Sequence, residues 1–120
     1  MEIIVHRIRL REGVDPDDFE EWVRETDYEA CRRLPGVVSF SVQRMAESTG
    51  EGTGAHYFEV IAVTGRADFD RDMKTETFRR LVDAFDVMAE VVEEWAGKRI
   101  DPGYTADRVD RNEQPIPRTP

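Results

Sequence analysis

Two histidines are the residues of this chain best suited to acid–base chemistry near neutral pH. His6 stands in IIVHRIRL (residues 3–10) and His56 in AHYFEVIAV (residues 55–63). An imidazole changes its charge between about pH 5 and 8, so each ring can take a proton from a bound molecule or give one to it. The alternative is that both are core residues, bonded to each other or to a backbone carbonyl. His6 and His56 are therefore our first catalytic candidates.

Asp27 and Tyr28, in RETDYEA (residues 24–30), are the next candidates. They interrupt the polar face of a predicted helix. In the functional interpretation, Tyr28 lines the mouth of a pocket and Asp27 orients a histidine or the substrate. In the structural one, Asp27 is an exposed acid and Tyr28 covers the edge of the helix. Both interpretations stay open at this point.

The first half of the chain has clear signals for a strand followed by a helix. Residues 3–10 alternate between two sets of side chains, which is typical of a strand. DPDDFEEW then opens a helix, since Asp15 can cap free amide groups and Pro16 suits the first helical position. The apolar residues of this helix recur at spacings of three and four, at Phe19, Trp22, Val23, Thr26, Ala30 and Leu34. LPG at residues 34–36 ends it.

The second half repeats the pattern with two strands first. Residues 37–45 and 55–63 alternate, and the Gly-, Ser- and Thr-rich segment 46–54 joins them as a loop. A short helical turn is expected around Phe69 and Met73. A long helix follows, with its apolar spacing kept by Phe78, Leu81, Val82, Phe85, Met88, Ala89 and Val92. Residues 97–106, broken by a proline and a glycine, are predicted as a weak edge strand.

This order predicts an α+β fold of the ferredoxin-like type, β-α-β-β-α-β, with one four-stranded antiparallel-type sheet. We expect one domain over residues 1–104 and a polar, proline-rich tail over 105–120. The first and third strands are expected side by side at the centre of the sheet, running parallel.

The alternation also predicts which side chains the helices cover. His6 shares its face of the strand with Ile4, Ile8 and Leu10, and His56 shares its face with Phe58, Val60 and Ala62. These more apolar sets are assigned to the helix-covered face. The opposite face carries Ile3, Val5, Ile61 and Val63, too apolar for water, so we expect a second copy to cover it as a homodimer with the two sheets face to face. Tyr57 and Glu59 would lie in that interface, where Glu59 pairs with Arg7 or Arg9. A catalytic role for Glu59 is a weaker alternative.

An aromatic-rich set is expected between sheet and helices, where part of it would line a pocket for a flat hydrophobic molecule. The predicted substrate-binding residues are Ile4, Ile8, Phe19, Trp22, Val23, Phe58, Met73, Phe78 and Phe85.

Composition argues against several other functions. The chain has 17 Lys and Arg against 26 Asp and Glu, a net charge of −9, which disfavours nucleic acid and anionic membrane as partners. Cys31 is the single cysteine and is expected to be a buried apolar residue. A metal site is not expected, because His56 and Glu59 fall on opposite faces of a strand. No cofactor motif is present, no apolar run approaches the roughly 20 residues of a membrane span, and we expect a cytoplasmic protein.

Three stretches carry a resemblance to a known family. They are IIVHRIRLREGVDPDDFEEWVRETDY, LPGVVSFSVQR and HYFEVIAVTGRADFDRDMKTETFRRLVDAFDVMAEVVEE. The chain resembles the dimeric α+β barrel superfamily, and within it the RedY-like proteins of bacterial clusters for pigments and indole-type natural products. The resemblance covers almost everything up to Tyr104. Members of this superfamily include cofactor-free monooxygenases, polyketide cyclases, haem-degrading enzymes and proteins with no known activity, and the resemblance implies one of these. Some cyclases of this class use a histidine where this chain has Phe78.

The function expected from residues and resemblance together is a cofactor-independent enzyme of natural-product biosynthesis. It would bind a flat conjugated aromatic intermediate and promote cyclisation, dehydration or tautomerisation, with His6 and His56 moving protons. Three alternatives stay open: an NAD(P)H-dependent reductase of a quinone-like intermediate, a non-catalytic carrier of a hydrophobic intermediate, and a cofactor-free monooxygenase.

Overall fold

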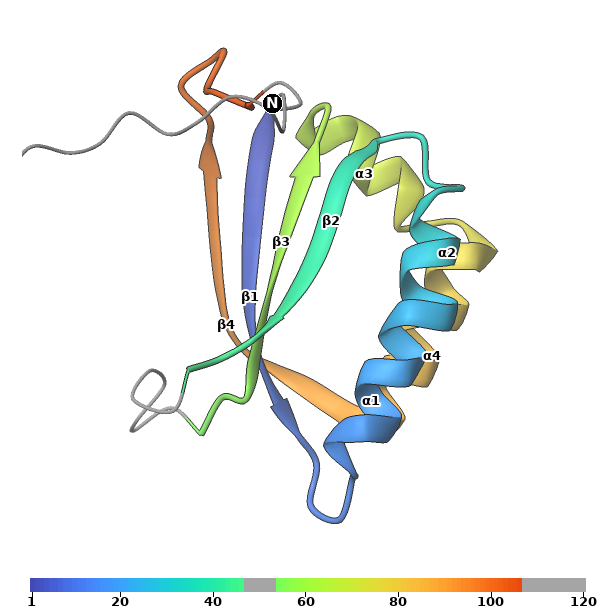
Figure 1. Cartoon of the computed structure of the whole chain (residues 1–120). Helices are drawn as coiled ribbons and strands as arrows, with labels where there is room; N and C mark the ends of the chain where they lie inside the picture. The colour runs from blue at the N-terminus through green and yellow to red at the C-terminus, as the bar shows by residue number, and fades with distance from the viewer. Residues whose placement is uncertain (47–53, 107–120) are drawn as a thin grey trace, which may run out of the picture.

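The computed structural model of the chain describes residues 1–46 and 54–106, which form a four-stranded antiparallel sheet with helices on one face (Figure 1). The strands are β1 (Glu2–Leu10), β2 (Val37–Arg44), β3 (Tyr57–Val63) and β4 (Ala89–Lys98). Their order across the sheet is β2-β3-β1-β4, so β1 and β3 are central, as predicted. The β-α-β-β-α-β order along the chain is confirmed.

The first predicted helix forms as one continuous rod of three segments. They are α1 (Pro16–Trp22), the π-helical segment η1 (Val23–Asp27) and α2 (Tyr28–Cys31). It begins as predicted: the Asp15 side chain accepts a hydrogen bond from the Asp17 backbone N–H, and Pro16 takes the first helical position. The expected turn around Phe69 is α3 (Arg66–Asp72), and α4 (Glu76–Met88) follows.

Two apolar clusters join the helices to the sheet. In the first, Phe19 of α1 packs on Tyr57 of β3, with ring centroids 4.9 Å apart, and on Ile8 of β1. In the second, Ile4 and Val63 of the central strands pack against Phe69 of α3. Each cluster uses both central strands, so the helices are attached to the middle of the sheet.

The fourth strand lies earlier than predicted. β4 starts at Ala89, directly after α4 ends at Met88, whereas the sequence predicts a helix through Val92 and a strand over 97–106. Val91 and Val92 fit a strand as well as an amphipathic helix, and Val91 pairs with Ile8 of β1. Residues 99–106 lie beyond the strand, and Ile100 is 92% exposed.

The predicted direction of the two central strands is also wrong. β1 and β3 run antiparallel, with Ile4 opposite Ile61 and His6 opposite Glu59. β3 also pairs antiparallel with β2. The chain therefore reverses direction between β2 and β3, and β3 pairs with β2 on one edge and with β1 on the other.

The face assignment of β3 is opposite to the prediction. Side chains directly opposite each other in an antiparallel pair share a face. Ile61 and Glu59 therefore lie on the helix side with Ile4 and His6, while Phe58, Val60 and Ala62 lie on the other side. Every residue of β3 from Tyr57 to Val63 except Glu59 is apolar or aromatic. Alternation alone therefore cannot choose between its two faces.

A bulge changes the faces of β2 in a similar way. The register shifts between Val37 and Ser39, so Val37 packs with Phe40 against the helix-side cluster. Val38, which regular alternation would place on the same face as Phe40, is instead 51% exposed. One inserted residue accounts for the difference.

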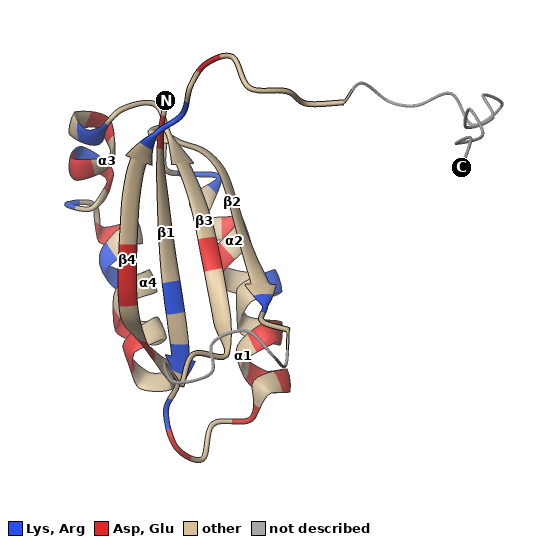
Figure 2. Ribbon diagram, turned by 90° about the vertical axis from the view of Figure 1, so that its left-hand side faces the viewer, with Lys and Arg blue, Asp and Glu red and all other residues tan. Residues whose placement is uncertain are grey.

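The second face of the sheet has no helix over it among the described residues, and Figure 2 looks onto it. Ile3 and Val5 of β1 lie there as predicted, beside Phe58 and Val60 of β3. Trp95 of β4 lies opposite Val5. This face is therefore apolar around Val5 and Val60, and it carries an ion pair between Arg7 and Glu93.

Two predictions fall on residues outside those described: most of the loop at 46–54, of which 47–53 are not described, and the tail from Asp107 onward. Within residues 1–46 and 54–106, none of the helices has the length and apolar character needed to cross a membrane.

Candidate functional site

A cavity of about 320 Å³ lies between the sheet and the helices. It falls at the lower end of the roughly 300–1,000 Å³ range of small-molecule sites. Most of its lining is apolar. Aromatic rings contribute from four elements, namely Trp22, Phe40, Phe69, Phe78 and Phe85. Such a lining suits a flat apolar molecule.

The polar end of the cavity is a row of three side chains across the sheet. His6 of β1 lies directly opposite Glu59 of β3 on one side and Glu94 of β4 on the other. Nδ1 of His6 is 2.7 Å from Oε1 of Glu59, and Nε2 is 2.7 Å from Oε2 of Glu94. All three residues line the cavity. The strand register alone brings them together.

This arrangement determines the charge of His6. An ionised carboxylate only accepts hydrogen bonds, so a ring bonded to two carboxylates must carry a proton on each nitrogen. Burial by itself lowers the pKa of His6, but the hydrogen bonds and negative charges of Glu59 and Glu94 outweigh it and raise the pKa above its ordinary value. Both hydrogen bonds and the raised pKa favour the doubly protonated imidazolium form of His6.

Asp27 lines the same cavity from the helix layer and is buried, with 8% of its surface exposed. Burial raises the pKa of Asp27 to about 7, the negative charge of Glu59 adds to the rise, and a hydrogen bond from Cys31 Sγ opposes it. The Sγ–Oδ1 distance is 3.8 Å. Asp27 can therefore exist both with and without its proton near neutral pH.

The π-helical segment is the reason why Asp27 faces the cavity. The Tyr28 N–H bonds to the Val23 carbonyl, five residues earlier, so one extra residue is accommodated in this turn. The sequence places Thr26 on the apolar face, by spacing from Val23. In the structure Thr26 is exposed and Asp27 is buried. The wider π-helical turn therefore directs Asp27, rather than Thr26, towards the interior.

Cys31, at the end of α2, also lines the cavity. Burial, with the nearby carboxylates Asp27 and Glu59, raises the pKa of its thiol to about 12. The thiolate is the nucleophilic form, so Cys31 is unreactive at neutral pH. Among the described residues, no group of three or more His, Cys, Asp and Glu side chains is placed to hold a metal ion.

Of the four predicted catalytic residues, His6 and Asp27 line the cavity, and His56 does not. His56 precedes β3 and is exposed. Its Nδ1 accepts a hydrogen bond from the Leu10 backbone N–H at 3.0 Å, and its own backbone N–H donates to the Ile8 carbonyl at 2.8 Å. His56 thus ties the start of β3 to the end of β1, and the prediction that it faces the helices together with His6 is wrong.

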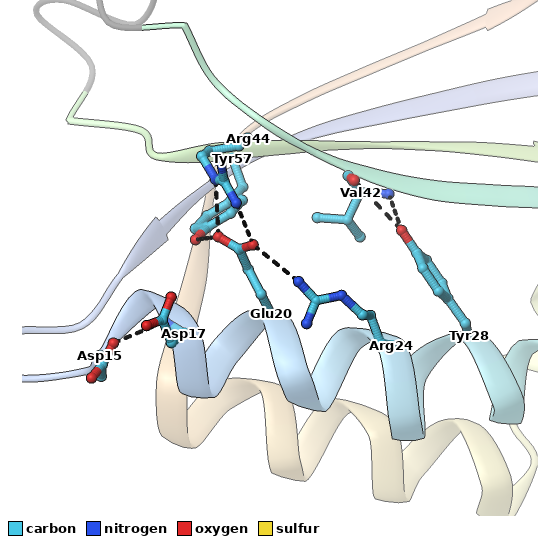
Figure 3. Close-up of polar contacts among 8 residues, drawn as sticks. All are labelled: Asp15, Asp17, Glu20, Arg24, Tyr28, Val42, Arg44 and Tyr57. Atoms are coloured by element: carbon cyan, nitrogen blue, oxygen red, sulfur yellow. Dashed lines mark hydrogen bonds and ion pairs between the residues drawn. The ribbon is translucent and has the colours of Figure 1, made fainter.

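Tyr28 does not line the cavity either, and its side chain points from the helix towards Val42 of β2 (Figure 3). Its hydroxyl accepts a hydrogen bond from the Val42 backbone N–H at 3.0 Å and so attaches the helix to β2. Two turns earlier, Glu20 accepts hydrogen bonds from Arg44 of β2 and from the Tyr57 hydroxyl of β3. The hydrogen bonds from Arg44 and Tyr57 lower the pKa of Glu20 to about 2. These contacts position the helix.

Five of the nine predicted substrate-binding residues line the cavity: Ile4, Trp22, Met73, Phe78 and Phe85. Three others, Ile8, Phe19 and Val23, are buried in the neighbouring core cluster. Phe58 lies on the opposite face of the sheet, because the parity of β3 is reversed.

Sequence reasoning missed two members of the polar row. Glu59 was assigned to the dimer interface through the same parity error, and Glu94 was not singled out, because the predicted helix covered its neighbours. Glu94 had one signal that could have found it: it lies in a segment with two adjacent valines, VVEE, that fits a strand.

A ferredoxin-like antiparallel sheet with helices on one face, and a cavity beneath them, is the architecture of the dimeric α+β barrel superfamily. Within it, the chain belongs to the REDY-like protein HapK family, whose family model matches residues 2–100. This confirms the resemblance to RedY-like proteins.

Solved structures support the assignment. HapK from Hahella chejuensis is 50% identical, over 89% of this chain and 100% of that one, with a TM-score of 0.82. SnoaB, a cofactor-independent oxygenase from Streptomyces nogalater, is 18% identical over 84% of this chain and 94% of its own, with a TM-score of 0.66. A putative antibiotic biosynthesis monooxygenase from Nitrosomonas europaea is also 18% identical, over 83% and 99%, with a TM-score of 0.64. The last two show the fold alone. No curated protein matches the chain.

Proposed function

We propose that this protein is an enzyme of secondary-metabolite biosynthesis that binds a flat, conjugated aromatic intermediate in the cavity beneath the helices. It would promote cyclisation, dehydration or tautomerisation by proton transfer. Membership of the REDY-like HapK family supports the role in secondary metabolism. The observation that carries the chemistry is a carboxyl group, Asp27, buried in an aromatic-lined cavity that also holds His6.

The two polar residues would divide the work. Asp27 has a pKa of about 7, so it can give a proton to one atom of the ligand and take one from another near neutral pH. His6 is cationic and would stabilise negative charge that develops on a ligand oxygen or carbon. A rigid apolar cavity would hold the reacting atoms together and keep water away. This assignment replaces His56 by Asp27 as the partner of His6.

The binding step can be tested on Trp22, whose ring lines the cavity. Carbazole, a flat three-ring molecule, should shift the indole N–H signal of Trp22 in a ¹⁵N NMR titration. The second tryptophan, Trp95, is 54% exposed, and the variant Trp95→Phe identifies its signal. Val82 lines the cavity from α4, so Val82→Trp should fill the space and weaken binding at least about tenfold, or about 1.4 kcal/mol.

Val87→Trp is the matched control for this binding test. Val87 is on the same helix but 75% exposed and outside the cavity lining, so this variant should bind carbazole like the starting protein. Equal binding by the Val82→Trp protein would contradict a ligand site in this cavity. Binding of pathway intermediates without any conversion would favour the non-catalytic carrier.

We also propose that the protein is a homodimer, with the uncovered sheet faces of two copies packed together. Ile3, Val5, Phe58 and Val60 form an apolar patch on that face, which supports this partner. Val60→Asp places a charge at the centre of the patch and should convert the dimer to a monomer, measured by light scattering after gel filtration. Val87→Asp, with the same change on an exposed helix position, should stay dimeric. A Val60→Asp protein that remains a dimer would contradict this interface.

A further inference from the structure

Glu94 lies opposite His6 only because β4 contains a bulge. Counting back from the pair Ile8–Val91, a regular strand would set Glu93 opposite His6. The register shifts between Arg7 and Ile8, so Val92 is an extra residue and Glu94 takes that place. Glu93 moves to the other face, where it pairs with Arg7 at 3.5 Å.

The three side chains of the row differ in exposure. The Glu59 side chain is 13% exposed, His6 is 17% exposed and Glu94 is 53% exposed. Glu94 therefore reaches Nε2 of the ring from the solvent side, while Nδ1 points to the more buried Glu59. Because each ring nitrogen has a hydrogen-bond partner, the two contacts together fix the orientation of the His6 ring.

We propose that Glu94 is a positioning residue of this site, which holds the His6 ring in place and in its doubly protonated form from the β4 side. Glu94 acts through His6. The two hydrogen bonds support this role, because only the imidazolium can donate to both carboxylates at once.

The other charged or titratable groups that line the cavity form no hydrogen bond or ion pair with the His6 ring among the described residues. Asp27 and Cys31 from the helix layer, Asp86 from α4, Glu90 from β4 and Arg66 from α3 line the same space. Glu90 is engaged by Arg9 and Arg11. Among the described residues, Glu59 has an ion pair with His6 alone. Loss of the ring's charge would leave Glu59 without a cation.

The charge of His6 also affects the pKa of Asp27, and the importance of this effect rests on the proposed function. The negative charge of Glu59 is one of the causes that raise the pKa of Asp27. While His6 is protonated, its positive charge offsets that of Glu59. By keeping His6 protonated, Glu94 would limit the rise and keep Asp27 able to release its proton near neutral pH.

The experiment is a pH titration of the full-length protein labelled with ¹⁵N in its histidine rings, which needs no substrate. The chain has two histidines, so His56→Gln identifies the His6 signals. Glu94→Gln keeps an oxygen that can accept from Nε2 but removes the charge. We expect its His6 midpoint to move to lower pH. Glu93→Gln makes the same change one residue away on the opposite face and should leave His6 unchanged.

Two results would overturn the positioning role: an unchanged His6 midpoint in the Glu94→Gln protein, or an equal shift in the Glu93→Gln protein, which would indicate a general charge effect. The Asp27 carboxyl, followed by ¹³C labelling, tests the link to the proposed function separately. Its midpoint should rise in Glu94→Gln but show no further change when Glu94→Gln is added to His6→Gln. A shift at His6 without one at Asp27 would overturn that link and uphold the positioning role.

Discussion

Replacing Asp27 by asparagine is expected to reduce turnover of the aromatic intermediate by about 10²–10⁴-fold, the usual contribution of a positioned acid–base group. Asparagine has nearly the same shape but neither gives nor takes a proton. The turnover of the unchanged protein should depend on pH around 7, where the Asp27 carboxyl titrates, and this dependence should disappear in the variant. The measurement is product formation from pathway intermediates between pH 5 and 9.

The same variant should be more stable than the unchanged protein at pH 8. The pKa of Asp27 is about 7 in the folded chain against an ordinary value of 3.8, so the folded state binds the proton more tightly than the unfolded state. Stability therefore falls as pH rises between these two values, and asparagine removes that loss. Urea denaturation should show that the Asp27→Asn variant exceeds the unchanged protein in free energy of unfolding by more at pH 8 than at pH 5.

Asp83→Asn provides the control, because Asp83 is exposed on α4 and does not line the cavity. It should change neither turnover nor the pH dependence of stability. An Asp27→Asn protein with full turnover would contradict the proposed acid–base role. A less stable variant would contradict the buried, proton-retaining state of this carboxyl.

Replacing Phe19 by alanine is expected to lower the free energy of unfolding by about 3–5 kcal/mol, the cost of deleting a buried aromatic ring. Phe19 is 1% exposed. Its ring centroid lies 4.9 Å from that of Tyr57, 6.2 Å from Trp22 and 6.3 Å from Phe85. These contacts join α1 to β3 and α4, so removing the Phe19 ring weakens the packing of the helices on the sheet.

Urea denaturation followed by circular dichroism measures this effect. Val87→Ala, at a 75% exposed position of α4, is the comparison and should change stability by no more than about 0.5 kcal/mol. Because Trp22 and Phe85 also line the cavity, carbazole binding should weaken in the Phe19→Ala protein. A loss below that of Val87→Ala would show that Phe19 is not part of a close-packed core.

Much of the fold could be predicted from local patterns. The alternation of β1, the Asp15–Pro16 start of α1 and the turn around Phe69 each depend on neighbouring residues, so sequence is sufficient for them. The position of His6 on the helix side also followed, because β1 has one face that is clearly more apolar. The position at which α4 ends could not be predicted, because residues 89–92 suit a helix and a strand equally.

The site itself depended on three features that local patterns do not contain. The reversed parity of β3 brought Glu59 rather than His56 to His6. The π turn turned Asp27 inward in place of Thr26. The bulge at Val92 placed Glu94 opposite His6.

The sequence by itself determined which segments form strands and helices, since this depends on side-chain periodicity and on residues that begin and end an element. Only the tertiary structure decided which carboxylates meet His6. An insertion of one residue in a strand or helical turn moves every later side chain to a new direction, and pairing with a distant strand decides whether that insertion occurs. The residues of the candidate site come from segments up to 88 positions apart, so their meeting is a property of the packed sheet.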